Sequence, residues 1–163
     1  MVIAYVGIVC ITTYIGFIFS KKYVIRYKIY NQLIEFLNYY KLQICYAQKK
    51  LLDVAECFAE NNEDDYIHLD EFINYLKVEF YNINNFVFND NLEYLSKLEC
   101  SQIESIYNSL GKFDLMQEKQ NIDLILLKLN GELLKAKDIK VKYCGFCVKI
   151  GIIFGCFIIV LLL

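Results

Sequence analysis

Long uncharged stretches lie at both ends of the chain and enclose a middle part that mixes charged and apolar residues. Residues 1–20 carry no charged side chain, and residues 150–163 form a second uncharged stretch. A helix of about 20 apolar residues crosses the ~30 Å hydrocarbon layer of a membrane. The second stretch reaches this length from residue 143, because Lys149 can extend to the lipid headgroups. The pattern predicts two transmembrane helices, at residues 1–20 and 143–163.

The middle part, residues 21–142, has the apolar spacing of helices. Apolar residues recur at steps of three and four from residue 21 to residue 60, without proline or glycine, which predicts one long amphipathic helix. A second helix is expected over residues 69–80. Two short helices follow, with N-terminal caps predicted from two pairs of side chains. These pairs are Asp90 with Glu93 and Ser101 with Glu104.

A last long helix is predicted after a break at Gly111, a residue that often ends a helix. Asp114 can cap the helix that follows. Its apolar residues continue the helical spacing, and no break separates them from the second uncharged stretch. No segment has a convincing strand pattern, although residues 85–89 (NFVFN) are ambiguous. The sequence predicts an all-α chain in which two transmembrane helices flank a helical domain of residues 21–142.

Basic residues border both predicted spans on the side of the middle part. They are Lys21, Lys22, Arg26 and Lys28 after the first span, and Lys135, Lys137, Lys140, Lys142 and Lys149 around the start of the second. Lys and Arg stay on the cytoplasmic side of a membrane, so we expect a cytoplasmic middle domain. A cleaved signal peptide is the alternative for the first span, but it needs basic residues before its apolar run.

Eight carboxylates follow one another without an intervening Lys or Arg, and we call them the acidic cluster. They are Asp53, Glu56, Glu60, Glu63, Asp64, Asp65, Asp70 and Glu71. On a continuous helix they would lie about 50–60 Å along the chain from the membrane, at the tip of the domain. The cluster is either a solvated face that keeps the tip soluble or an electrostatic docking patch for a basic partner.

The composition offers little material for catalysis. The net charge is −2, which does not favour nucleic acid, and His68 is the only histidine. No Gly-rich phosphate loop is present, so we expect no enzyme, no cofactor and no metal. A Ca²⁺-responsive membrane protein is one alternative, because residues 60–71 align with an EF-hand loop. Asp65, however, stands where that loop needs glycine.

A membrane-tethered thiol oxidoreductase is the other alternative, based on Cys144 and Cys147. Such a pair needs a helix N-terminus to lower the thiol pKa. These two residues lie instead inside a predicted continuous helix, so we favour small apolar residues beside a membrane span. In that span Gly151 and Gly155 form a GxxxG match, which packs either on the first span or on another membrane protein.

Two local motifs complete the picture. Leu110, Gly111 and Asp114 fit a Leu-Gly-x-Ser-Asp-x-x-x-Gln stretch, with Glu118 at the Gln position. Gln43, Ile44 and Tyr46 echo a Glu-Ile-x-Tyr element. With the terminal spans and the basic borders, these residues resemble the stage III sporulation protein AB family.

The resemblance implies a cytoplasmic bundle similar to that of the type II secretion F protein. It also implies a scaffold or adaptor in the secretion-like channel complex that links mother cell and forespore during endospore formation. Its place would be the mother-cell membrane around the forespore. The partners would be the lipid bilayer, other membrane proteins of the complex and a cytoplasmic ATPase.

Overall fold

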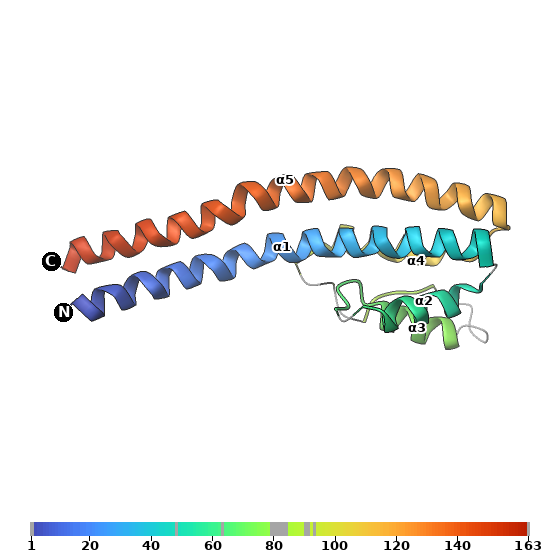
Figure 1. Cartoon of the computed structure of the whole chain (residues 1–163), viewed down its shortest axis with the longest axis horizontal. Helices are drawn as coiled ribbons and strands as arrows, with labels where there is room; N and C mark the ends of the chain where they lie inside the picture. Colours follow the sequence, from blue (N-terminus) through green and yellow to red (C-terminus); the bar gives the residue numbers. More distant parts are fainter. Residues whose placement is uncertain are drawn as a thin grey trace. The chain divides into compact units, whose positions relative to one another are not determined.

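The computed structural model describes residues 2–47, 49–62, 64–78, 85–89, 92 and 94–162. These residues form five helices and no strand, which confirms the all-α prediction for the part described (Figure 1). The helices are α1 (Val2–Ala47), α2 (Leu51–Glu60), α3 (Leu69–Val78), α4 (Lys97–Ser109) and α5 (Leu115–Leu162).

The chain divides into two compact units, and α1 and α5 contribute to both. Unit 1 contains Met1–Tyr27 and Leu134–Leu163, and unit 2 contains Lys28–Leu133. Among the described residues, α5 alone is long and apolar enough by composition to cross a membrane. The side chains of residues 1–6 and 8 lie outside the description, so the first predicted span falls only partly within it.

Unit 1 is an antiparallel pair of helix segments that approach each other closely at glycines. A Cβ atom added to Gly16 would lie 2.6 Å from the carbonyl oxygen of Cys147. One added to Gly151 would lie 2.6 Å from the carbonyl oxygen of Thr12. Small residues at such positions let two helix backbones pack directly on each other.

Unit 2 has an aromatic core centred on Tyr107 of α4. The Tyr107 ring stacks on Phe72 of α3 with ring centroids 4.3 Å apart, and Phe86 and Phe36 meet it edge-on at 5.4 Å and 6.4 Å. Its hydroxyl donates a hydrogen bond of 3.0 Å to the carbonyl of Ile67. Burial raises the pKa of Tyr107 well above its usual value. This residue therefore joins α1, α3, α4 and the segment before α4.

The prediction of one helix from residue 21 to residue 60 is wrong. Helix α1 ends at Ala47, Lys50 has an extended backbone, and α2 starts at Leu51. The reversal buries Val54, Ala55 and Phe58 of α2, and Phe58 packs against Phe36 of α1 with ring centroids 5.4 Å apart. A continuous helix would have carried these apolar residues away from α1. Tertiary burial therefore ends the helix without proline or glycine.

The predicted caps before α4 also need correction. Asp90 and Glu93 lie outside the described residues, and Ser101 lies inside α4 rather than at its start. Helix α4 starts instead at Lys97, and its capping box is formed by Ser96 and Glu99. Helix α3 ends at Val78, and residue 80 of its predicted range lies outside the described residues.

The ambiguous NFVFN segment has no regular secondary structure, and its backbone forms hydrogen bonds with side chains of α4. The amide of Phe86 donates to Asn108 Oδ1 at 2.7 Å, and its carbonyl accepts from Asn108 Nδ2 at 2.8 Å. The amide of Phe88 donates to Glu104 Oε1 at 3.0 Å. Polar side chains one turn apart on α4 thus satisfy this backbone.

Candidate functional site

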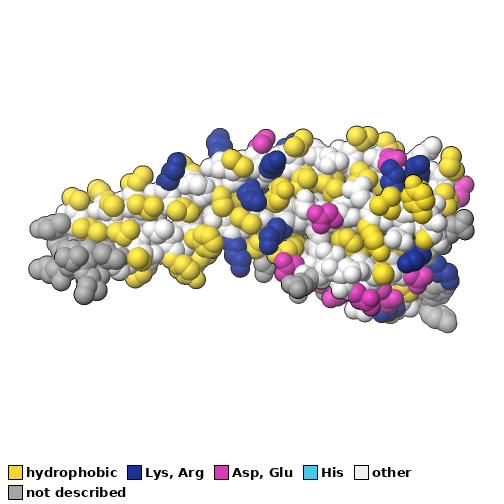
Figure 2. Space-filling view, in the orientation of Figure 1, with side chains coloured by type: hydrophobic (Ala, Val, Ile, Leu, Met, Phe, Trp, Pro, Cys, Tyr) yellow, Lys and Arg dark blue, Asp and Glu magenta, His cyan; other side chains and the backbone are white. Residues whose placement is uncertain are grey.

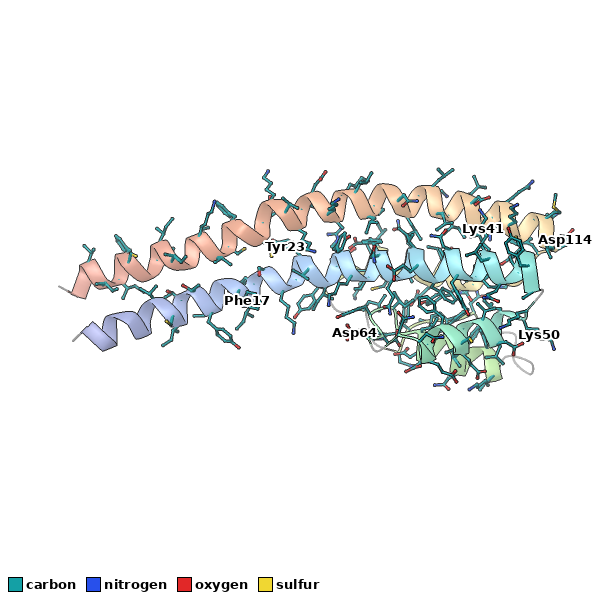
Figure 3. The ribbon with its side chains drawn as sticks, in the orientation of Figure 1. Phe17, Tyr23, Lys41, Lys50, Asp64 and Asp114 are labelled. Atoms are coloured by element: carbon teal, nitrogen blue, oxygen red, sulfur yellow. The ribbon has the colours of Figure 1, made fainter. Side chains whose placement is uncertain are left out.

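Tyrosine and lysine side chains contact one another in unit 1 at the point where its charged residues begin. Tyr23 of α1 stacks on Tyr143 of α5, with ring centroids 5.3 Å apart (Figure 3). The ammonium groups of Lys140 and Lys142 lie 4.3 Å and 5.7 Å from the ring centroids of Tyr27 and Tyr143. We call these five residues the collar. Tyrosine and lysine together are typical of a membrane–water interface.

The uncharged residues beyond the collar are largely exposed. Figure 2 shows hydrophobic side chains over this part of unit 1. Several of its phenylalanine and isoleucine side chains, such as Phe19, Ile153 and Phe154, are more than 60% accessible. A helix pair that exposes apolar side chains on its outer surface suits a lipid environment, in which such exposure carries no penalty.

Helix α5 carries two opposite apolar faces within unit 2. One face is buried in the unit and contains Ile122, Leu126 and Leu129. The other exposes Met116, Leu124 and Leu127, whose side chains are 69%, 61% and 72% accessible. At 3.6 residues per turn these three positions lie on the side away from the buried ones. We call them the outward face of α5. An exposed apolar patch on a helix is typical of an interaction surface.

The acidic cluster lies on α2, on α3 and on the loop between them, where Figure 2 shows several carboxylates. It does not lie at the end of one helix running to residue 60, because α1 ends at Ala47 and a separate helix, α2, carries the first members of the cluster. Gln32 of α1 explains the position of the loop. Its Nε2 donates to the carbonyl of Asp64 at 2.5 Å, and its Oε1 accepts from the amide of Tyr66 at 2.9 Å. The loop is thereby tied to α1 near Lys28, and Figure 3 shows Asp64 well away from Lys50.

Several carboxylates of the cluster are already bound inside unit 2. Glu56 forms an ion pair of 2.7 Å with Lys77. Asp64 accepts a hydrogen bond of 2.8 Å from the Tyr66 hydroxyl. Glu63 lies outside the described residues. The exposed members whose side chains remain for a partner are Asp53, Glu60 and Asp70.

The Ca²⁺ alternative gains no support from this loop. Both carboxylate oxygens of Asp65 accept hydrogen bonds from main-chain amides of α3, at 2.8 Å from Leu69 and 3.2 Å from Asp70. Glu71 lies 3.1 Å from the ring of His68 and accepts from the amide of Asn89 at 3.1 Å. In the part of the chain that the structure describes, no three His, Cys, Asp or Glu side chains gather in a metal-binding arrangement. Asp65 therefore caps α3.

The thiol oxidoreductase alternative also gains no support from the described residues. Cys144 and Cys147 are free and lie about 30 residues inside α5, far from its N-terminus. In the part of the chain that the structure describes, neither residue stands at the helix N-terminus that a thiol oxidoreductase pair needs.

Residues just before the Gln43–Tyr46 motif contact the start of α5. The hydroxyl of Tyr40, one turn before Ile44, donates to Glu118 of α5 at 3.3 Å, and Lys41 pairs with Asp123. Ile44 is buried, Gln43 is half-buried, and Tyr46 is exposed. The structure thus brings Tyr40 and Lys41 of α1 against residues of α5 that lie about 80 positions further along the chain.

Glu118 holds the loop between α4 and α5. Its Oε1 accepts a hydrogen bond of 2.8 Å from the amide of Gly111, and the side chain is only 3% accessible. Gly111 has a φ of 74°, which favours glycine, and follows Leu110, the buried C-cap of α4. Asp114 directly precedes α5, and its carbonyl accepts from the amide of Glu118 at 2.8 Å. Burial, and then the Glu118 carboxylate, raise the pKa of Tyr40. The motif spacing locates Glu118 in the sequence, but it does not indicate that the carboxylate accepts hydrogen bonds from Gly111 and Tyr40.

Replacing Glu118 by alanine is expected to destabilise unit 2 by about 1–2 kcal/mol, because the Gly111 amide and the Tyr40 hydroxyl lose their acceptor. Glu118→Gln keeps an acceptor oxygen in place and should stay close to the parent. Proteolysis of the loop at Lys112 in the full chain measures the effect. Equal cleavage rates for the alanine and glutamine variants would show that Glu118 does not hold the loop.

Gly151 and Gly155 face α1 of the same chain. A Cβ atom at Gly155 would lie 2.5 Å from Thr12 Oγ1 and 3.1 Å from Val9 Cα. The structure therefore uses both glycines for packing within unit 1.

Comparison with known proteins places the chain in a family. No curated protein and no solved structure matches it. The family described as stage III sporulation protein AB matches residues 1–163, the whole chain. This match confirms the resemblance carried by the two motif segments. The chain therefore belongs to the stage III sporulation protein AB family.

Proposed function

We propose that this protein is a non-catalytic scaffold or adaptor in the secretion-like channel complex that links mother cell and forespore. It is anchored in the mother-cell membrane by two spans, residues 1–20 and 143–163, and its helical domain faces the cytoplasm. The domain has a bundle of the type II secretion F-protein kind and couples a cytoplasmic ATPase to the membrane assembly. Membership of a stage III sporulation family supports a role in sporulation.

The observation that carries the proposal is the helix pair of unit 1. Two uncharged segments pack antiparallel through Gly16 and Gly151, and both continue into charged sequence at the collar. Packing of the first span on the second gives a two-span anchor. Among the described residues, α5 is the one helix long and apolar enough to cross a membrane. Lysines on the collar side favour a cytoplasmic position for unit 2.

An adaptor also needs a surface for other proteins, and unit 2 offers two. The outward face of α5 exposes three large apolar side chains, whereas much of the acidic cluster is bound internally. Apolar contacts supply most of the binding energy at protein interfaces, and exposed charges mainly affect the association rate. We therefore assign the main contact with the membrane proteins of the complex to the outward face. The exposed carboxylates Asp53, Glu60 and Asp70 steer a basic partner.

The double variant Leu124→Ser, Leu127→Ser is expected to reduce crosslinking of the chain to its membrane partners in sporulating cells at least tenfold. Loss of two apolar anchors from an interface commonly has an effect of this size. Both side chains are exposed, so the fold should remain intact. The number of spores formed provides a second readout.

Leu98→Ser is the matched control, because Leu98 of α4 is 72% accessible and lies outside this face. A separate variant with Asp53→Asn, Glu60→Gln and Asp70→Asn tests the carboxylates without removing the cap formed by Asp65. If the leucine variant crosslinks as the parent does and the carboxylate variant does not, the main contact lies on the acidic cluster.

A further inference from the structure

Unit 1 contains a groove between its two helices that the packing of the pair does not fill. The groove has a volume of about 530 Å³. Gly16 and Gly151 form its floor, where the backbones approach, and larger residues such as Phe19 and Phe154 line its sides. Both phenylalanines are more than half accessible. The missing side chains of the glycines therefore leave an open apolar channel along the helix pair.

One end of the groove is polar and positively charged. The lining on α1 runs from Thr12 to Lys22 and Tyr23. Eleven residues of helix span about 16 Å, close to half of the ~30 Å hydrocarbon layer. The apolar length thus matches one leaflet, and the lysine stands at the level of the collar.

The charge around that end decides the headgroup that fits. Lys21, Lys140, Lys142 and Lys149 belong to the same unit as Lys22, with Asp138 as the opposing charge. A cationic ammonium on a lipid headgroup would be repelled by this excess of lysines, whereas a headgroup with net negative charge would be attracted. Basic sites between transmembrane helices on the cytoplasmic side commonly bind such lipids.

We propose that the groove binds one anionic phospholipid of the cytoplasmic leaflet. An acyl chain lies over Gly16 and Gly151 between the phenylalanines, and the phosphate pairs with the ammonium of Lys22 beside Tyr23. This inference rests on the proposed membrane anchoring of unit 1. It adds a lipid ligand to the helix pair, and binding of that lipid would hold α1 and α5 together at the collar.

The test uses the full chain with Phe19→Trp, because the sequence has no tryptophan and the new indole becomes a single fluorescent reporter in the groove. The protein is placed in vesicles of equal parts phosphatidylglycerol and phosphatidylcholine, with bromine on one lipid or the other. Bromine quenches a nearby indole. We expect about fivefold preferential quenching by brominated phosphatidylglycerol, the size of one lysine–headgroup attraction.

Two lysine variants separate the groove from the general charge of the collar. Lys22→Gln should lower the preference below about twofold, and Lys22→Arg should restore it. Lys21→Gln removes the same charge from the adjacent residue, which does not line the groove, and should keep the preference. Quenching by brominated phosphatidylcholine reports insertion of each variant.

The contrary outcomes are distinct. Equal quenching by the two lipids, or equal losses for Lys21→Gln and Lys22→Gln, would overturn the lipid site and leave the membrane anchor standing. Absence of quenching by either lipid would overturn both the site and the anchor.

Discussion

Replacement of Tyr107 by alanine is expected to remove about 3–5 kcal/mol from the free energy of unfolding of unit 2. The ring fills the centre of the aromatic core, with its stacking partner Phe72 at 4.3 Å and edge-on contacts to Phe36 and Phe86. The substitution leaves a cavity between Phe36, Phe72 and Phe86, which lie on three different segments and cannot all move in to close it. A loss of this size is a large fraction of the stability of a domain. Hydrogen exchange of the α4 amides in the full chain in detergent measures it.

Tyr107→Phe provides the control for the ring. It keeps the packing and removes only the hydrogen bond to the carbonyl of Ile67, so the expected cost is about 1 kcal/mol. Amide exchange that is as slow in the alanine variant as in the parent would contradict the position of Tyr107 at the centre of the core.

Gly151→Leu is expected to weaken the helix pair of unit 1 by about 3 kcal/mol. Its Cβ atom alone would lie 2.6 Å from the carbonyl oxygen of Thr12, which belongs to the backbone of α1 and cannot rotate away. The two helices must separate to accept the side chain. Pyrene labels on Cys10 and Cys156, both exposed, report the separation as a loss of excimer emission during SDS titration, with the other cysteines changed to serine.

Gly145→Leu is the matched control on the same helix. A Cβ atom at Gly145 meets no neighbouring atom within 4 Å. The leucine should therefore leave the SDS concentration at which half of the excimer emission is lost unchanged, or raise it slightly through better helix propensity. Equal midpoint shifts for the two variants would show that Gly151 does not lie at the helix interface.

The long terminal helices were predictable because their signal is local. Uncharged residues and an unbroken helical spacing define both ends of the chain, and α5 extends without a break from Leu115 to Leu162. The end of α1 was not predictable in this way. Residues 48–60 keep the apolar spacing of the preceding helix, and only the burial of Phe58 against Phe36 shows why the chain reverses at that point.

The reversal also changes the course of the chain through the acidic cluster. A helix running to residue 60 would carry the cluster outward, whereas the actual turn brings α2 back and lets Gln32 hold the loop at Asp64. Contacts across more than 30 residues leave no periodic trace in a sequence. The cap at Ser96 was different, because Ser96 and Glu99 have the same spacing as the pair at Ser101. The same spacing occurs at Asp90, Ser96 and Ser101, and the pair at Ser96 is the one that caps α4.

The outward face of α5 could have been found from the sequence. The apolar residues assigned to the core follow one stripe, and Leu124 and Leu127 fall between its members on the opposite side of the helix. Two apolar faces on one helix predict two partners. The burial of Glu118 could not be predicted in this way, because a glutamate in a helix is usually exposed. Its hydrogen bond from the Gly111 amide explains why this one is buried.

The membrane sidedness of unit 2 decides whether the helical domain is cytoplasmic. Protease-cleavable tags can be inserted into the full chain after Asn61 and after Lys112, which are exposed residues outside the helices, and a third can be added after Leu163. When the tagged chain is produced in vegetative cells, where it inserts into the outer cell membrane, we expect protease added to intact protoplasts to cut the tag after residue 163 and to spare the other two until the protoplasts are lysed. Cleavage after residue 61 or residue 112 in intact protoplasts would contradict a cytoplasmic bundle held beneath the membrane by two spans.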